Sequence, residues 1–324
     1  MMSVNKIMTQ PETDMEPRAS GTDHYDGIVL IDKDAGRTSF DVVKDVRRIL
    51  KVRKVGHAGT LDPFATGLLV ILLGQGTKLF PYLMPGKKIY RATLRLGVET
   101  DTHDPTGRVV QTKPVPKLEH GYIQEKASEF VGEIEQAPPI FSAVKYKGER
   151  AYEFARKGAK IEIEKRWVKI YDLKITSLDF PDVTMEISCS SGTYIRSLAA
   201  DLGEKLGTGA HLKTLRRLSS GPFSVKDALN PRLTHIPVSH HLLRDKIISL
   251  RDALPDMKEI RIDAKIAKKI RDGYQPGYDE VFSGAGPHEG YMKLVKDKEL
   301  VAITKEHQPS GDDGGRLRIM RVFI

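Results

Sequence analysis

The segment GHAGTLDPFATGLL (residues 56–69) contains an aspartate, Asp62, in a setting suited to chemistry. Pro63 follows it, and a residue before proline is pushed into an extended conformation, so the carboxylate should project from a tight turn. Small residues on either side allow a large substrate to approach the backbone. In isolation, the same Leu-Asp-Pro sequence is more often an Asx-type turn in which the aspartate caps nearby backbone.

A second segment, CSSGTYIRSLAADLGEKLGTGAHLKTLRRL (residues 189–218), could supply a partner for that carboxylate. Gly192 should end a strand, and Tyr194 and Arg196 should open a helix. From the first turn, Arg196 could reach out of the fold and bind a carboxylate with two parallel hydrogen bonds. The alternative is a surface arginine and a core tyrosine. Cys189 is expected to be a small buried residue on the preceding strand, not a nucleophile.

Tyr90 adds an aromatic ring to these two groups. An ionised Asp62 beside Arg196 can act as a nucleophile or as a base. An aromatic ring next to them can stack on a base that has been removed from an RNA helix. Together the three residues favour chemistry on a nucleotide more than any of them does alone.

Other catalytic motifs are missing from the chain. The segment GQGTKLF (residues 74–80) lacks the third glycine of a dinucleotide fingerprint, and no complete P-loop, HExxH or GxSxG motif occurs. The single cysteine excludes an intramolecular disulfide and a multi-cysteine zinc site. We therefore expect no cofactor and no metal ion.

The charge balance points weakly to an anionic partner. Lys and Arg number 52 against 43 Asp and Glu, a net charge of +9, and the pI is about 9.3. This excess suggests RNA or DNA but does not identify either. No apolar run reaches the ~18 residues of a membrane-spanning helix, and the N-terminal stretch has no signal-peptide core, so we expect an intracellular protein without a membrane contact.

The elements that must position these residues form an α+β pattern. A helix should follow Thr38, with Phe40, Val43, Val46 and Leu50 on its buried face. Alternation predicts a half-buried strand over 88–97, with Tyr90 on its inner side. The remaining predicted elements are strands at 26–33, 67–74, 161–178 and 183–190, and helices at 118–131, within 138–158 and at 194–206.

Three regions are expected along the chain. Residues 1–24 are polar, without periodicity, and predict a disordered tail. Residues 25–252 carry the mixed elements and all candidate catalytic residues. Residues 253–324 contain short apolar runs separated by Gly, Asp and Pro, which is typical of a small β-rich domain.

At this level of detail the chain closely resembles the bacterial TruB family of tRNA pseudouridine synthases. The resemblance extends from about residue 27 to 218 and rests on five motifs: GHAGTLDPFATG, KIYRATLRLG, TDTHDPTG, PPIFSAVKYKGERAYEFARKG and SGTYIRSLAADLGEKLGTGAHLKTLRRL. It implies a catalytic domain with a mixed, largely antiparallel sheet, and a small C-terminal PUA-like domain. It also implies isomerisation of the uridine at position 55 in the TΨC loop of tRNA, in the cytoplasm, by a monomer that needs no protein partner.

The resemblance also implies a role for individual residues. Asp62, Tyr90 and Arg196 match the catalytic aspartate, the tyrosine that stacks on the flipped uracil, and the arginine that pairs with the aspartate. The positions that match substrate-binding residues are His57, Tyr194, Leu215 and Lys33. The family's DKPxG stretch reads DKDAG here, so Asp34 replaces the usual proline. The expected contacts to RNA phosphates are Lys145, Lys147, Arg150, Arg156, Lys213, Arg216 and Arg217.

Two other functions remain open on the residues alone. A non-catalytic RNA-binding module or tRNA folding chaperone would use the same basic surface without needing Asp62, Tyr90 and Arg196 together. An RNA glycosidase would break the same bond and release free uracil. Whether Asp62 attacks the uracil ring or the sugar C1′ also stays open.

Overall fold

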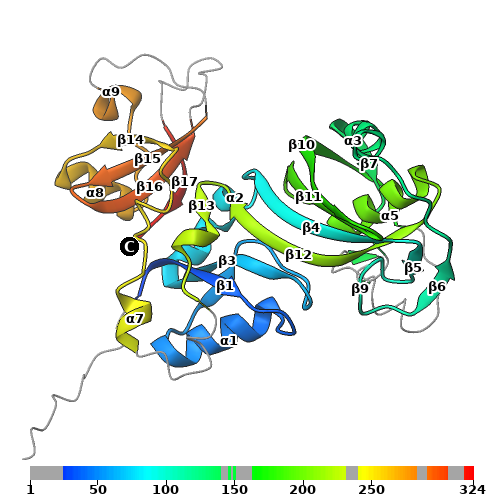
Figure 1. The fold of residues 1–324 in the computed structure, drawn as a ribbon. Helices are drawn as coiled ribbons and strands as arrows, with labels where there is room; N and C mark the ends of the chain where they lie inside the picture. The colour runs from blue at the N-terminus through cyan, green and yellow to red at the C-terminus, as the bar shows by residue number, and fades with distance from the viewer. Residues whose placement is uncertain are drawn as a thin grey trace, which may run out of the picture.

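A long sheet runs through the larger part of the molecule (Figure 1). The computed structural model describes residues 25–139, 145–146, 149–150, 163–230, 240–282, 290–305 and 317–324. The sheet order is β1-β3-β12-β4-β11-β10-β7, with β2 added to β3 and β13 to β12. Its strands are β1 (Gly27–Lys33), β2 (Val55–His57), β3 (Thr66–Leu73), β4 (Lys88–Leu96), β7 (Gly132–Gln136), β10 (Arg166–Asp179), β11 (Asp182–Cys189), β12 (Ala210–Ser220) and β13 (Phe223–Ser224).

The pairing confirms a mixed, largely antiparallel sheet. Every neighbouring pair in it is antiparallel except β12 and β3. At that parallel contact, Arg217 lies between Gly67 on β3 and Tyr90 on β4. Gly67 has φ +102°, and a Cβ there would lie 2.3 Å from the carbonyl oxygen of Arg217, so only glycine fits. The centre of the sheet is therefore packed backbone against backbone.

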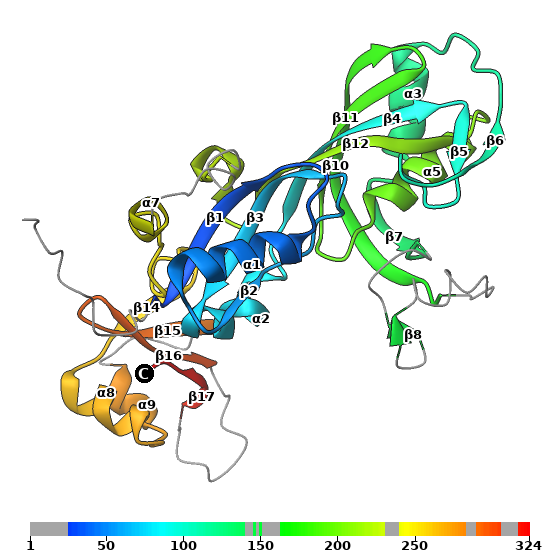
Figure 2. The same ribbon diagram turned by 90° about the horizontal axis from the view of Figure 1, so that it is seen from below.

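Helix α1 (Ser39–Leu50) covers the β1–β3 end of the sheet (Figure 2). Its start carries a capping box in which Thr38 and Asp41 bond each other's backbone N–H. The buried face contains Val42, Val43, Val46 and Leu50. The prediction that Phe40 is on this face is wrong: its side chain is 54% exposed, because the helix turns it to solvent beside Lys44.

Helices α3 (His120–Ser128) and α5 (Ile195–Lys205) pack together at the other end of the sheet (Figure 1). They form one apolar core with β4, β10, β11 and β12. Strand β4 alternates as predicted, with Tyr90, Ala92, Leu94 and Leu96 on the buried side. Cys189 is fully buried on β11, as expected.

The C-terminal residues form a separate four-stranded sheet in the order β14-β15-β16-β17, with two short helices (Figure 2). Its elements are β14 (Lys258–Arg261), α8 (Ala264–Arg271), α9 (Tyr278–Val281), β15 (Tyr291–Lys296), β16 (Glu299–Lys305) and β17 (Arg318–Val322). Phe323 and Ile303 pack in the same apolar cluster as Leu79 and Leu83 of the larger part. The predicted boundary at residue 252/253 stays a prediction.

Short elements connect these layers. They are η1 (Gly74–Leu79), α2 (Phe80–Leu83), β5 (Val98–Thr100), β6 (Val109–Thr112), β8 (Lys145–Tyr146), β9 (Glu149–Arg150), η2 (Val225–Asp227) and α7 (His240–Arg244). The predicted N-terminal tail lies outside the described residues, and so does most of the range 138–158 in which a short helix was predicted; residues 145–146 and 149–150 of that range are strands. Among the described residues, no helix has the length and apolar character to cross a membrane.

Candidate active site

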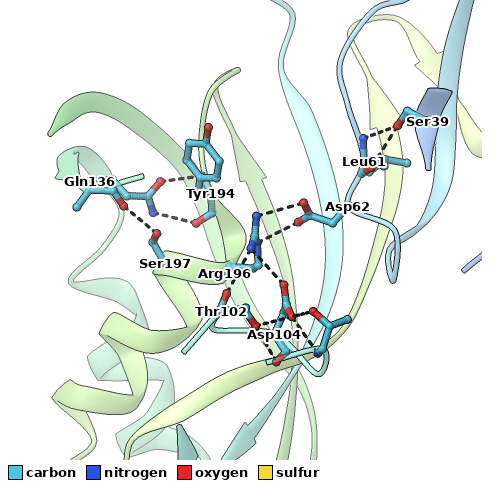
Figure 3. Close-up of polar contacts among 11 residues, drawn as sticks. Ser39, Leu61, Asp62, Thr102, Asp104, Gln136, Tyr194, Arg196 and Ser197 are labelled. Carbon is cyan, nitrogen blue, oxygen red and sulfur yellow. Dashed lines mark hydrogen bonds and ion pairs between the residues drawn. The ribbon is translucent and has the colours of Figure 1, made fainter. Parts of the chain in front are cut away.

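Asp62 lies in the loop between β2 and β3, and its carboxylate projects from that loop as predicted (Figure 3). Ser39, the first residue of α1, bonds the backbone of Leu61 twice: its hydroxyl accepts from the N–H at 2.9 Å and donates to the carbonyl at 3.2 Å. Ala65 N–H then closes a turn on the carbonyl of Asp62 at 3.1 Å. The loop is thus fixed on both sides of Asp62, whose side chain stays 32% exposed.

Arg196 meets this carboxylate from the first turn of α5 (Figure 3). Its Nη2 donates to Oδ1 of Asp62 at 3.2 Å, and its Nε lies 3.1 Å from Oδ2. The pairing predicted from the sequence is therefore present, with two contacts between guanidinium and carboxylate. The expectation that Arg196 reaches out of the fold is wrong: its side chain is only 5% exposed, because the loop after β5 covers it.

That covering loop supplies Asp104, a residue to which the sequence analysis assigned no role. Its Oδ2 accepts from Nη1 of Arg196 at 3.1 Å, so the guanidinium lies between two carboxylates (Figure 3). Its Oδ1 accepts from Thr102 Oγ1 at 2.7 Å and from the N–H and hydroxyl of Thr106 at 2.9 and 2.6 Å. The sequence Thr-His-Asp-Pro-Thr could have indicated an ordered turn around Asp104, because hydroxyl groups two residues before and after an aspartate can hold its carboxylate in place.

Burial dominates the electrostatics of Asp62. It raises the pKa of this carboxyl above its ordinary value; the charge of Arg196 opposes that shift, Asp104 adds to it, and Lys33 opposes it. The expected action of Arg196 in favour of the ionised form is present, but its effect is smaller than that of desolvation. The site therefore holds a carboxylate that is partly desolvated, partly open to solvent, and oriented by a guanidinium.

Tyr90, Leu215 and Tyr194 lie around the same place. Tyr90 and Leu215 are each 7% exposed and belong to the core cluster that also contains Leu61. Burial raises the pKa of the Tyr90 phenol, while the charge of Arg217 and a hydrogen bond from it act in the opposite direction. Tyr194 is half-buried directly before α5, with the guanidinium of Arg166 over its ring at 5.1 Å. A carboxylate bordered by apolar and aromatic side chains suits a planar, uncharged ring.

Two residues with predicted RNA or substrate contacts are instead buried cations that hold backbone. Lys33 is 1% exposed, and its Nζ donates to the carbonyls of Asp34, Arg37 and Pro63. Arg217 is also 1% exposed and donates to three carbonyls, those at positions 59, 60 and 68. The prediction that Arg217 contacts a phosphate is corrected: it faces inward next to Leu215 because alternate residues of β12 share a face.

The other residues predicted to contact RNA are either more exposed than Lys33 and Arg217 or lie in segments that the structure does not describe in full. His57 ends β2; burial lowers its pKa, as does Arg217, so the ring is neutral at pH 7. Lys213 donates to Asp182 at 2.6 Å, and Arg216 makes two hydrogen bonds to Asp32 at 3.0 and 2.6 Å. Lys145 and Arg150 are paired across β8 and β9, with no described side chains, and Lys147 and Arg156 lie outside the described residues.

Two family models together match residues 47–257 of the chain. The model of the N-terminal domain of TruB family pseudouridylate synthases matches residues 47–195, and the model of the tRNA pseudouridylate synthase B C-terminal domain matches residues 196–257. The first match includes Asp62, Tyr90 and Asp104, and the second begins at Arg196. Asp62, Tyr90, Asp104 and Arg196 therefore all fall within the two matched regions.

Whole-chain relatives agree with these models. The chain is 44% identical to tRNA pseudouridine synthase B of Geobacter sulfurreducens over 303 residues, which are 92% of this chain and 99% of the relative. It is 46% identical to the enzyme of the same name from Clostridium kluyveri, over 86% of this chain and 94% of the relative. Among solved structures, a Cbf5–Nop10–Gar1 complex contains a chain with a TM-score of 0.70 and 26% identity, covering 98% of this chain and 91% of that one. The chain belongs to the TruB family of pseudouridylate synthases.

Proposed function

We propose that this protein isomerises a uridine of tRNA to pseudouridine, at position 55 in the TΨC loop. The observation that carries the proposal is the Asp62 carboxylate on the β2–β3 loop, held through two contacts by Arg196 on the first turn of α5. The relatives named tRNA pseudouridine synthase B support tRNA as the substrate. The resemblance of the chain to the TruB family supports the position in the loop.

The reaction needs no external reactant. The bond between N1 of uracil and C1′ of ribose breaks, the base rotates, and C5 bonds to C1′ while the hydrogen of C5 leaves as a proton and N1 gains one. Asp62 supplies the negative charge that this sequence requires, whether its oxygen attacks C1′ or the ring. In a partly desolvated site such a charge acts more strongly than it does in water.

We assign the neighbouring residues to binding the flipped base. Tyr90 stacks on the ring, with the charge of Arg217 beside its hydroxyl. Tyr194 and Leu215 shape the pocket and replace the stacking that the base loses when it leaves the loop, and the ring of His57 helps to hold the opened RNA loop. Lys213 leaves Asp182, and Arg216 leaves Asp32, when these two side chains bind phosphates of the RNA.

We further propose that the chain acts as a cytoplasmic monomer and needs no protein partner. The C-terminal four-stranded sheet serves as a PUA-like RNA-binding domain. We expect the purified chain to be active on a naked tRNA transcript and to sediment as a monomer. A requirement for a second protein would contradict it.

The test uses an unmodified tRNA transcript labelled with tritium at C5 of its uridines. The wild-type protein should release label in proportion to the pseudouridine formed, and a transcript with cytidine at position 55 should release none. Asp62→Asn should bind tRNA normally but lose at least about 10³-fold in kcat. Full activity of this variant would remove Asp62 from the mechanism, and label retained by a protein that binds the transcript would favour an RNA-binding module. Release of free uracil would identify a glycosidase.

A further inference from the structure

The start of α5 is attached to the sheet edge by the side chain of Gln136, the last residue of β7 (Figure 3). Its Oε1 accepts from the N–H of Tyr194 at 2.7 Å, and its Nε2 donates to the carbonyl of Tyr194 at 3.0 Å. One side-chain amide thus bonds both backbone groups of a single residue, as a neighbouring strand would do. Because both bonds must form together, they permit only one orientation of that backbone.

Tyr194 depends on this outside partner. It is the residue before the first turn of α5, has an extended backbone (φ −97°, ψ 107°), and has no side-chain cap hydrogen bond of its own. Its carbonyl also accepts the first helical bond, from Leu198 N–H at 3.1 Å. Gln136 is 1% exposed, so its amide cannot exchange these partners for water without opening the site.

Two further contacts join the same elements. Ser197, on the first turn of α5, donates its hydroxyl to the carbonyl of Ala137 at 2.9 Å. Arg166 is the cross-strand partner of Gln136 on β10, lies over the ring of Tyr194, and has its Nη2 3.4 Å from the Tyr194 hydroxyl. The edge formed by β7 and β10 therefore holds both the backbone and the ring of Tyr194.

The residue that needs this precision is Arg196, two positions further along the chain. Its guanidinium must reach Asp62 and Asp104 at the same time, with contacts of 3.1–3.2 Å to both (Figure 3). Arg196 enters the site from the helical turn whose start Gln136 orients. We propose that Gln136 is a positioning residue, which sets the direction of the first turn of α5 and so places Arg196 on Asp62 and Tyr194 against the base. The kinetic part of this inference rests on the proposed isomerase function.

The chain contains a matched control for the same kind of bond. Gln124 on α3 also bonds one strand with both ends of its amide: Nε2 donates to the carbonyl of Leu173 at 3.0 Å, and Oε1 accepts from Ile175 N–H at 2.8 Å. It lies on a helix that contributes no residue to the site. Gln124→Met therefore removes a clamp of the same kind, at a partly buried position, and reports the structural cost of losing one.

Steady-state kinetics with the tritiated transcript compare Gln136→Met with Gln124→Met. For Gln136→Met we expect kcat to fall about 10- to 100-fold, the effect of misplacing a catalytic group by about 1 Å, with KM for tRNA within about twofold of wild type. Gln124→Met should lower the melting temperature and leave kcat near wild type. Equal kcat values for the two variants, or an effect of Gln136→Met on KM alone, would overturn the proposal.

A second measurement does not depend on turnover. The pKa of Asp62 can be followed by NMR of a ¹³C-labelled carboxyl group in the free protein, with Asp62→Asn for assignment. A displaced Arg196 opposes desolvation less well, so the pKa of Asp62 should rise in Gln136→Met and stay unchanged in Gln124→Met. If the wild type makes no pseudouridine, the proposed function is wrong, but this titration still tests the role of Gln136. A pKa of Asp62 that is unchanged in both variants would contradict the positioning role of Gln136.

Gln136→Glu provides a test that loss of side-chain volume cannot mimic. A protonated carboxyl can accept from Tyr194 N–H and donate to its carbonyl, whereas the ionised form sets two acceptors against each other. Arg166 across the strand and Arg196 on the following turn both favour ionisation. The kcat of this variant relative to wild type should therefore fall as the pH rises, and a ratio independent of pH would contradict the clamp.

Discussion

Two kinds of buried cation surround the Asp62 loop, and they differ in what they bind. Arg196 contacts two carboxylates, those of Asp62 and Asp104. Lys33, Lys88 and Arg217 donate to backbone carbonyls instead. A carbonyl is neutral and fixes the course of the chain, whereas a carboxylate can act on a substrate.

The carbonyl-bound cations all act on segments that border the site. Lys33 bonds Pro63 directly after Asp62, Arg217 bonds the loop just before it, and Lys88 bonds the turn that leads into β4. Burial lowers the pKa of both lysines to about 8. The cations that bind carbonyls therefore keep the loop in place, although their burial costs desolvation free energy. Arg196 instead orients the reactive carboxylate of Asp62.

The largest predicted effect follows from Arg196→Lys. An ammonium cannot contact Asp62 and Asp104 together in the geometry of the guanidinium, so it leaves a buried carboxylate poorly paired. Breaking such a pair costs about 3–5 kcal/mol, and a loss of the same size in the transition state lowers kcat by about 10²- to 5 × 10³-fold. The tritium-release assay measures this loss, with Arg216→Lys as the control for a partly exposed arginine. A loss below tenfold would place Arg196 among the structural cations.

Asp104→Asn should have an intermediate effect, a decrease in kcat of about 10- to 100-fold. The amide can still accept from Arg196 but no longer offers a full charge to hold the guanidinium. The negative charge of Asp104 also raises the pKa of Asp62, so its removal should lower that pKa. The acid limb of the kcat profile should then move to lower pH, and movement to higher pH would contradict the arrangement.

Lys33→Met should affect stability more than chemistry. It leaves three carbonyls without their donor, which we expect to cost about 2–4 kcal/mol of unfolding free energy. The sign of the pH effect follows from the lowered pKa. Between about 8 and the ordinary value of 10.5, the unfolded chain binds protons that folded Lys33 and Lys88 have lost, so wild-type stability should rise with pH there.

Urea unfolding at several pH values measures this slope. It should decrease in Lys33→Met and again in the double variant with Lys88→Met. A slope unaffected by either substitution would mean that these lysines titrate normally and are not buried cations. The kcat of Lys33→Met, measured where the variant is folded, should remain above that of Arg196→Lys.

Comparing these cations also explains how far the sequence could predict the site. Strand β4 was predictable because alternation is a local signal. The pairing of Asp62 with Arg196, 134 residues apart, was expected from their complementary charges and from the motifs shared with the TruB family, not from a local pattern. Arg217 was assigned to RNA, although Leu215, two residues earlier, was already expected to line the pocket. If 210–220 had been interpreted as a strand, alternation would have placed Arg217 inward with it.

Asp104 and Gln136 were harder to predict for a different reason. Asp104 lies on a connecting loop, and its partner Arg196 is 92 residues away along the chain, so no local sequence pattern predicts the contact. Gln136 is 58 residues from Tyr194 and sits on an edge strand, where a polar residue usually faces water. Only the way in which β7, β10 and α5 pack together makes either residue part of the site.

The smallest predicted effect concerns the surface cations. For them, one experiment can decide whether a cation binds RNA or only stabilises the fold. Lys213 is 42% exposed and paired with Asp182, so it contacts a phosphate only after leaving that carboxylate. Lys213→Ala should weaken tRNA binding a few-fold and reduce the slope of log Kd against log salt by about 1, without changing kcat. Asp182→Asn should do the opposite and tighten binding, because it releases both Lys213 and Arg95 from a shared carboxylate. If instead Asp182→Asn weakens binding at every salt concentration, the pair stabilises the strands β4, β11 and β12, and Lys213 joins the structural cations inside.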